Sequence, residues 1–131
     1  MASQRAEDAR RRIELQEQDR RREGAAAQQL IDEFVVTARE RGLVTEPLRA
    51  QLLDGHTAKT DRRGWYLNAS RSLAIGENGE YFQLVVPGGF KERLRGVTLE
   101  PSLPSLHIGR GGRDGETGYL KEFLSWRLDA G

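Results

Sequence analysis

Residues 72–86 read SLAIGENGEYFQLVV, and this stretch decides the fold class. Two β-prone runs, 72–75 and 80–86, flank the tetrapeptide Gly76-Glu77-Asn78-Gly79. An Asn-Gly pair favours the positive φ angles of a tight turn, so the stretch predicts an antiparallel hairpin. Because side chains alternate along a strand, Phe82, Leu84 and Val86 should share the more apolar face of the second run.

Other short β-prone runs lie on both sides of this hairpin. Residues 56–59 and 65–67 flank the turn-forming sequence Asp61-Arg62-Arg63-Gly64, which predicts a second hairpin. Residues 97–100 and 106–108 follow, separated by a bend that contains Pro101 and Pro104. The runs together predict a small, mostly antiparallel sheet of four or five strands between residues 56 and 108.

Three helices are expected around the sheet. Residues of about 25–41 carry apolar side chains at helical spacing, and Gly42 follows as a C-cap. Pro47 suits a first helical turn, and Leu48, Leu52 and Leu53 predict a short helix of about 46–53, which would form an αα-hairpin with the first. A C-terminal helix of about 118–128 would bury Leu120, Phe123, Leu124 and Leu128. The predicted fold class is therefore α+β.

A charged helical arm is predicted over residues 1–23, outside a compact unit formed by residues 24–131. Thirteen of the twenty residues from Gln4 to Glu23 are charged, seven of them arginine. Ala2, Ala6, Ala9 and Ile13 are spaced as in a heptad repeat. The pattern indicates a solvated single helix or a weak coiled-coil arm, with a partly disordered segment as the alternative. A single glycine costs a helix only about 1 kcal/mol, so arm and first helix can be continuous.

A helix that is polar nearly all round cannot be stabilised by packing on its own domain. It extends into solvent, pairs with another chain or docks on a charged surface. We therefore predict that the arm binds a protein partner or a second copy of the chain. The candidate contact residues are Arg10, Arg11, Arg12, Ile13, Arg20, Arg21 and Arg22.

Two basic stretches are candidates for binding nucleic acid or another anion. Aromatic side chains among basic ones can stack and hold single-stranded nucleic acid, although an ordinary hairpin with Trp65 in the core is the alternative. The glycine-rich loop 109–118 follows a predicted strand, but its spacing matches neither the dinucleotide nor the P-loop fingerprint. The candidate residues are Lys59, Arg62, Arg63, Trp65, Tyr66 and Arg71 in the first stretch, and Arg110 and Arg113 in the loop.

Catalysis is a weaker prediction. His56 lies close in the sequence to Thr57, Lys59 and Arg62, and these residues together could form a small nuclease-like site. The other histidine of the chain is His107. The sequence has no Gly-x-Ser-x-Gly motif and no metal-ligand spacing, and it predicts neither a metal nor a cofactor. An enzyme is thus less favoured than a binding protein.

Composition narrows the function classes further. The chain has 131 residues, 21 basic and 20 acidic, for a net charge of +1, and no cysteine. Net charge alone will not hold such a chain on DNA or an anionic membrane, and no apolar run approaches the ~18 residues of a membrane span. We expect a small cytoplasmic accessory or regulatory protein that acts by protein–protein binding, with nucleic-acid binding as the alternative.

Overall fold

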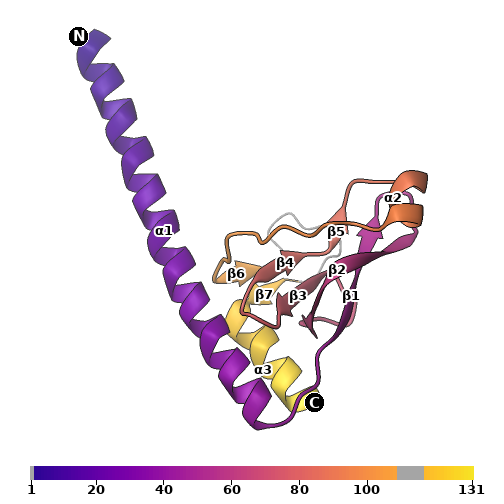
Figure 1. The fold of residues 1–131 in the computed structure, drawn as a ribbon. Helices are drawn as coiled ribbons and strands as arrows, with labels where there is room; N and C mark the ends of the chain where they lie inside the picture. Colours follow the sequence, from indigo (N-terminus) through magenta and orange to yellow (C-terminus); the bar gives the residue numbers. More distant parts are fainter. Residues whose placement is uncertain (1, 109–116) are drawn as a thin grey trace.

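The computed structural model describes residues 2–108 and 117–131 and has an α+β fold. A long N-terminal helix and a C-terminal helix lie beside a mostly antiparallel sheet (Figure 1). The elements are α1 (Ala2–Glu40), β1 (Glu46–Leu52), β2 (Thr57–Tyr66), β3 (Leu73–Gly76), β4 (Tyr81–Gln83), β5 (Val85–Val86), α2 (Phe90–Arg95), β6 (His107–Ile108), β7 (Gly118–Tyr119) and α3 (Leu120–Ala130). Within these described ranges, no helix is both long and apolar enough to cross a membrane.

The five-stranded sheet has the order β4-β3-β2-β1-β5, and only the β1–β5 pair is parallel. The predicted β3–β4 hairpin is confirmed, with Ile75 paired to Tyr81 and Gly79 at a φ of 88°. Only Leu84 separates β4 from β5, so the continuous stretch 81–86 pairs with β3 at its start and with β1 at its end. The sheet must therefore curve strongly enough to bring its two edges together at Leu84, whose N–H donates to the Ser72 carbonyl and whose carbonyl accepts the N–H of Gln51. Phe82 and Leu84 are buried in one cluster with Val86 packed against it, as their alternation predicted.

The predicted helix of about 46–53 is wrong, and with it the αα-hairpin. This segment is strand β1, which pairs with β2 on one side and β5 on the other. Leu48, Ala50 and Leu52 are buried, while Arg49 is exposed between them. The burial therefore follows the period of two that a strand requires, and two neighbouring strands satisfy the backbone.

The turn predicted at Asp61-Arg62-Arg63-Gly64 is also wrong, because β2 runs without interruption through it. A side chain at Gly64 would collide with the carbonyl oxygen of Ile75, so glycine serves here for close contact between β2 and β3. The Asp61 carboxylate accepts a hydrogen bond from the main-chain N–H of Leu99 at 2.9 Å. Asp61 and Gly64, which favoured a turn in the sequence, therefore make contacts between distant segments from within an extended strand.

Smaller differences concern the second half of the chain. The predicted strand 97–100 is reduced to an isolated bridge between Thr60 and Val97, and the short helix α2 was not predicted. The C-terminal helix begins at Leu120 rather than at residue 118, because Gly118 and Tyr119 pair with β6.

The core has one cluster on each face of the sheet. Ala27, Ile31, Phe34 and Ala38 of α1 pack with Leu120 and Leu124 of α3 over one face, around Trp65. The second cluster contains Leu48, Tyr66, Phe82, Leu84 and Leu99. The apolar stripe predicted for residues 25–41 is therefore the part of α1 that joins the body.

Candidate functional site: the projecting helix and a cationic pocket

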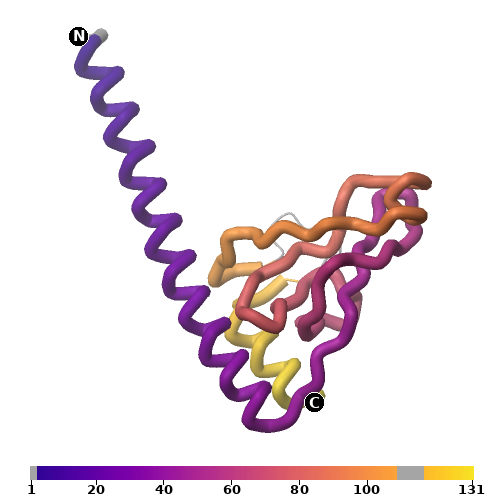
Figure 2. The backbone as a smooth tube through the Cα atoms, in the orientation of Figure 1, coloured from indigo at the N-terminus to yellow at the C-terminus, as the bar shows by residue number. Residues whose placement is uncertain are grey.

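Helix α1 is continuous over 39 residues, or about 58 Å, and only its C-terminal part packs on the sheet. All residues from 3 to 22 are exposed, and Figure 2 shows this part of the helix leaving the body. We call residues 3–22 the exposed arm. None of its side chains is buried against the rest of the chain.

The arm meets the body at two consecutive residues. The Glu23 carboxylate accepts hydrogen bonds from the Ser105 hydroxyl at 3.1 Å and from the main-chain N–H of Leu106 at 3.2 Å. Gly24 is buried, and a Cβ placed there would lie 2.8 Å from Leu103 Cδ1. The segment 103–106 therefore marks where the exposed arm begins.

The residues predicted as arm contacts all lie on this exposed rod: Arg10, Arg11, Arg12, Ile13, Arg20, Arg21 and Arg22. Ile13 is 55% exposed and Leu15 is 54% exposed, although both are large apolar side chains. The arm thus combines dense charge with apolar surface that its own body does not cover.

The aromatic residues predicted to stack nucleic-acid bases are buried. Trp65 is 1% exposed, donates from Nε1 to the Leu43 carbonyl at 3.1 Å, and packs edge-on against Phe34. Tyr66 is 4% exposed, and its hydroxyl accepts the main-chain N–H of Arg49 at 2.9 Å. Neither ring presents an open face as the predicted stacking surface requires.

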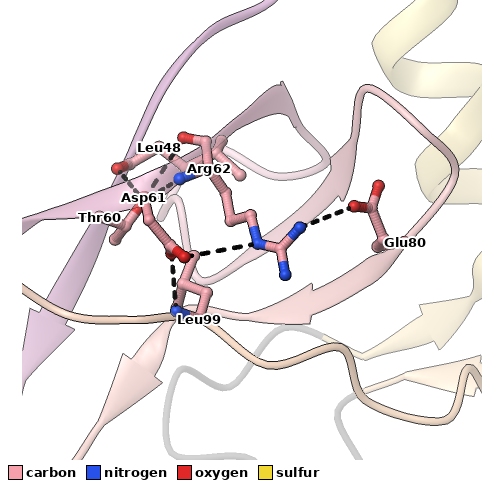
Figure 3. Close-up of polar contacts among 6 residues, drawn as sticks. All are labelled: Leu48, Thr60, Asp61, Arg62, Glu80 and Leu99. Carbon is pink, nitrogen blue, oxygen red and sulfur yellow. Dashed lines mark hydrogen bonds and ion pairs between the residues drawn. The ribbon is translucent and has the colours of Figure 1, made fainter.

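The basic residues of the same stretch are not gathered into one patch. Arg62 donates from Nη1 to Glu80 at 3.2 Å, and its Nε lies 3.8 Å from Asp61 (Figure 3). Its guanidinium also lies over the Phe82 ring. Arg63 donates to the Thr45 carbonyl at 2.9 Å. Arg62 is therefore held within the fold, while Lys59 and Arg63 remain exposed on β2.

A cationic pocket lies at another place on the sheet, with a volume of about 220 Å³. Its lining includes Arg49, His56, Thr57, Tyr66 and Arg71. Tyr66 and Arg71 were in the predicted anion-binding set, and His56 was in the predicted nuclease-like site. The structure brings these three together with Arg49, which the sequence interpretation missed because it assigned residues 46–53 to a helix. The alternation of apolar and polar residues over positions 48–52 was the sequence signal that could have found it.

His56 and Asp54 form a local pair at the β1–β2 turn beside this pocket. The main-chain N–H of His56 donates to Asp54 Oδ1 at 3.0 Å, and this hydrogen bond is the main cause that lowers the pKa of the Asp54 carboxyl. The imidazole Nδ1 of His56 lies 3.4 Å from the same oxygen, and its side chain is 57% exposed. His107 is elsewhere, on β6, where its ring contacts Tyr119.

The remaining predictions concern the glycine-rich loop and metal binding. Arg110 and Arg113 lie outside the described residues. Among residues 2–108 and 117–131, no group of three or more His, Asp or Glu side chains is placed to hold a metal ion. Comparison with protein-family models, curated proteins and solved structures found no match in any of the three.

Proposed function

We propose that this chain is a small, non-enzymatic accessory protein that acts by protein–protein binding, with the exposed arm as its contact surface. The observation that carries the proposal is the exposure of every residue from 3 to 22 on a continuous helix. This part of the helix gains no packing energy from its own body, and most helical stability in proteins comes from the packing of an apolar face. A partner that covers the arm would supply the missing stabilisation. A cytoplasmic setting belongs to the same proposal and is compatible with a chain that has no cysteine.

The occupant that best fits the arm is a second copy of this chain, running antiparallel. Ala6, Ala9, Ile13, Gln16 and Arg20 follow one another at the 3–4–3–4 spacing of a coiled-coil seam. If Ile13 of one arm lies opposite Gln16 of the other, Ala9 lies opposite Arg20. Each small or apolar seam residue then faces the aliphatic stem of a longer polar one, which is the part that can pack. Ala6 faces Glu23, where the partner's body begins, so residues 2–5 must leave the seam at that point.

The charges beside this seam complement one another in the antiparallel arrangement. The positions that flank an antiparallel seam are residues 10 and 17 on one side and residues 12 and 19 on the other. Arg10 therefore faces Glu17 of the partner, and Arg12 faces Asp19. The two-fold axis repeats both pairs, so every flanking charge along the centre of the overlap meets an opposite charge.

A parallel pair would keep only part of this match. Parallel, in-register helices place each seam residue against its own copy, so Arg20 would meet Arg20. At the flanking positions Arg12 would still face Glu17, but Arg5 would meet Arg10. The like charges at these positions disfavour the parallel form relative to the antiparallel one, in which all four central flanking pairs are opposite in charge.

The association should be weak and sensitive to salt. The seam has one large apolar residue, Ile13, and exposed ion pairs contribute only about 0.2–1 kcal/mol each. Salt screens interactions between such exposed charges. A reversible dimer that dissociates on dilution or in high salt is the expected behaviour, which suits a regulatory contact.

Sedimentation velocity over a roughly hundredfold range of concentration tests the proposal at low and high salt. The full chain should shift from monomer to dimer at low salt. Arg10→Glu combined with Arg12→Glu should remain monomeric, because both flanking pairs become repulsive. Adding Glu17→Arg and Asp19→Arg to that variant should restore the dimer.

The matched control is Arg11→Glu combined with Arg21→Glu, which makes the same change in net charge on the outer side of the arm. This control should dimerise like the original chain, with circular dichroism verifying that helix content is equal. A full chain that stays monomeric at every concentration contradicts the proposal. So does a control that dissociates as readily as the Arg10→Glu, Arg12→Glu variant.

The nucleic-acid alternative has less support because the rings of Trp65 and Tyr66 are buried and Arg62 is held by Asp61 and Glu80. The nuclease-like alternative around His56 remains a prediction from the sequence.

A further inference from the structure

The cationic pocket is built by two neighbouring strands and a loop. Arg49 comes from β1, Thr57 from the start of β2, and Ser70 and Arg71 from the loop between β2 and β3. The side-chain amide of Gln51 donates to the carbonyl oxygens of both Ser70 and Arg71, with the second bond at 3.0 Å. Gln51 therefore ties the loop to β1 and holds the two arginines around one cavity.

Each arginine is oriented by neutral neighbours. The Arg49 guanidinium donates from Nε and Nη2 to the Thr57 hydroxyl at 3.3 and 3.2 Å. A guanidinium has five N–H donors, so this contact does not use those on Nη1. The Arg71 guanidinium lies over the Tyr66 ring, 5.0 Å from its centroid. Arg71 also has a φ of 58°, a left-handed conformation that is uncommon for a residue with a side chain. The fold thus places both cations without using a negative charge.

The pocket is left with uncompensated positive charge. In the described part of the chain, no carboxylate lies within 4.0 Å of a guanidinium nitrogen of Arg49 or Arg71. Asp54, at the neighbouring turn, lies instead against His56 Nδ1 at 3.4 Å and Arg93 Nε at 3.7 Å. Two arginines that share a cavity repel each other, and a bound anion would remove that repulsion.

We propose that this pocket binds the terminal phosphate of a small phosphate monoester. Arginine donates paired hydrogen bonds that match phosphate oxygens, and Arg49 and Arg71 supply two such forks. The Tyr66 hydroxyl accepts a hydrogen bond from the main-chain N–H of Arg49 and so retains its own proton to donate. Ligand pockets for whole drug-sized molecules usually hold about 300–1,000 Å³, so a cavity of about 220 Å³ suits the phosphate group rather than everything attached to it.

NMR titration of the full chain with inorganic phosphate tests the site, with chloride at matched ionic strength as the reference. Amide signals of residues 49–57 and 66–71 should shift and saturate with phosphate. Arg49→Gln and Arg71→Gln should each weaken binding at least about tenfold, while Arg49→Lys should lie in between because it keeps charge but loses the paired donors. Arg95→Gln, an exposed arginine on α2, is the control that should bind like the original chain.

A second titration separates a terminal phosphate from the phosphodiester of a nucleic-acid backbone. Glycerol phosphate should bind at least as well as inorganic phosphate, and dimethyl phosphate should bind more weakly because it carries a single charge. Shifts that stay linear with concentration, or saturable binding that survives both Arg→Gln variants, overturn the proposal. Equal or tighter binding of dimethyl phosphate overturns the assignment to a monoester. Signals outside the pocket report whether each variant is folded.

Discussion

The carboxylate of Glu23 accepts the main-chain N–H of Leu106 at 3.2 Å, across 83 positions of sequence. This contact joins α1 to the segment before β6 at the level where α1 passes from exposed to buried. N-terminal to Glu23 the helix is free for a partner, and C-terminal to it the helix is part of the core. The boundary between the arm and the body therefore lies at Glu23 and Gly24.

Glu23→Ala should destabilise the chain by about 1–2 kcal/mol in urea unfolding, because it removes the acceptor of two hydrogen bonds. Amide hydrogen exchange at Leu106 should accelerate. Ser105→Ala is the partial version, since it removes one of the two donors and leaves the Leu106 contact. Equal exchange at Leu106 in the original chain and in Glu23→Ala would show that this contact does not hold the segment.

Gly24→Ala should raise stability by up to about 1 kcal/mol, because alanine is the better helix former. The new Cβ would lie 2.8 Å from Leu103 Cδ1, but Leu103 is 63% exposed and its side chain can rotate away. Thermal unfolding of Gly24→Ala, alone and with Leu103→Ala, measures both contributions. A loss of stability that Leu103→Ala does not relieve would contradict this explanation.

Gly64→Ala should have the opposite sign. The added methyl group would meet the main-chain carbonyl oxygen of Ile75, which cannot rotate away, so β2 and β3 must separate. We expect a loss of about 1–3 kcal/mol, typical of overpacking. Urea unfolding of the original chain and of Gly64→Ala measures the loss. If both proteins unfold at the same urea concentration, the close β2–β3 contact is not limiting.

The pKa of Asp54 should remain below its usual value in His56→Ala. The main cause that lowers this pKa is the main-chain N–H of residue 56, which the substitution keeps. A lowered pKa in the folded state means that this carboxylate stabilises the fold above its unfolded pKa, and that the contribution is lost as pH falls through the acidic range. Carboxyl-carbon NMR titration of both proteins measures it. A return of the Asp54 pKa to its ordinary value in His56→Ala would assign the effect to the imidazole instead.

Local patterns predicted several elements correctly. The stripe on residues 25–41 and the Asn78-Gly79 turn each describe structure that is decided within a few neighbouring residues. The charged composition of residues 4–23 predicted a helix, with a partly disordered segment as the alternative, and α1 includes these residues without a break at Gly24.

The errors occurred where tertiary contacts outweigh local preference. Leu48, Leu52 and Leu53 fit a helical spacing, but Leu48, Ala50 and Leu52 fit a strand equally well, and pairing with β2 and β5 decides between them. Gly64 resembles a turn residue, although its role is contact with Ile75. The cationic pocket could not be predicted because it depends on the β1–β2 register and on the loop that Gln51 holds.

Distances between spin labels test the antiparallel arm most directly, since the chain has no cysteine and a single one can be introduced cleanly. Gln4→Cys and Gln18→Cys both lie on the outer side of the proposed pair. The antiparallel form places the two labels at position 4 about 31 Å apart along the helix axis, and those at position 18 about 10 Å apart. Double electron–electron resonance, a pulsed EPR method, at dimer-forming concentration should therefore give a clearly longer distance between labels for Gln4→Cys than for Gln18→Cys. Equal distances at both positions would mean a parallel pair, and no measurable coupling at either would mean that the arms do not pair.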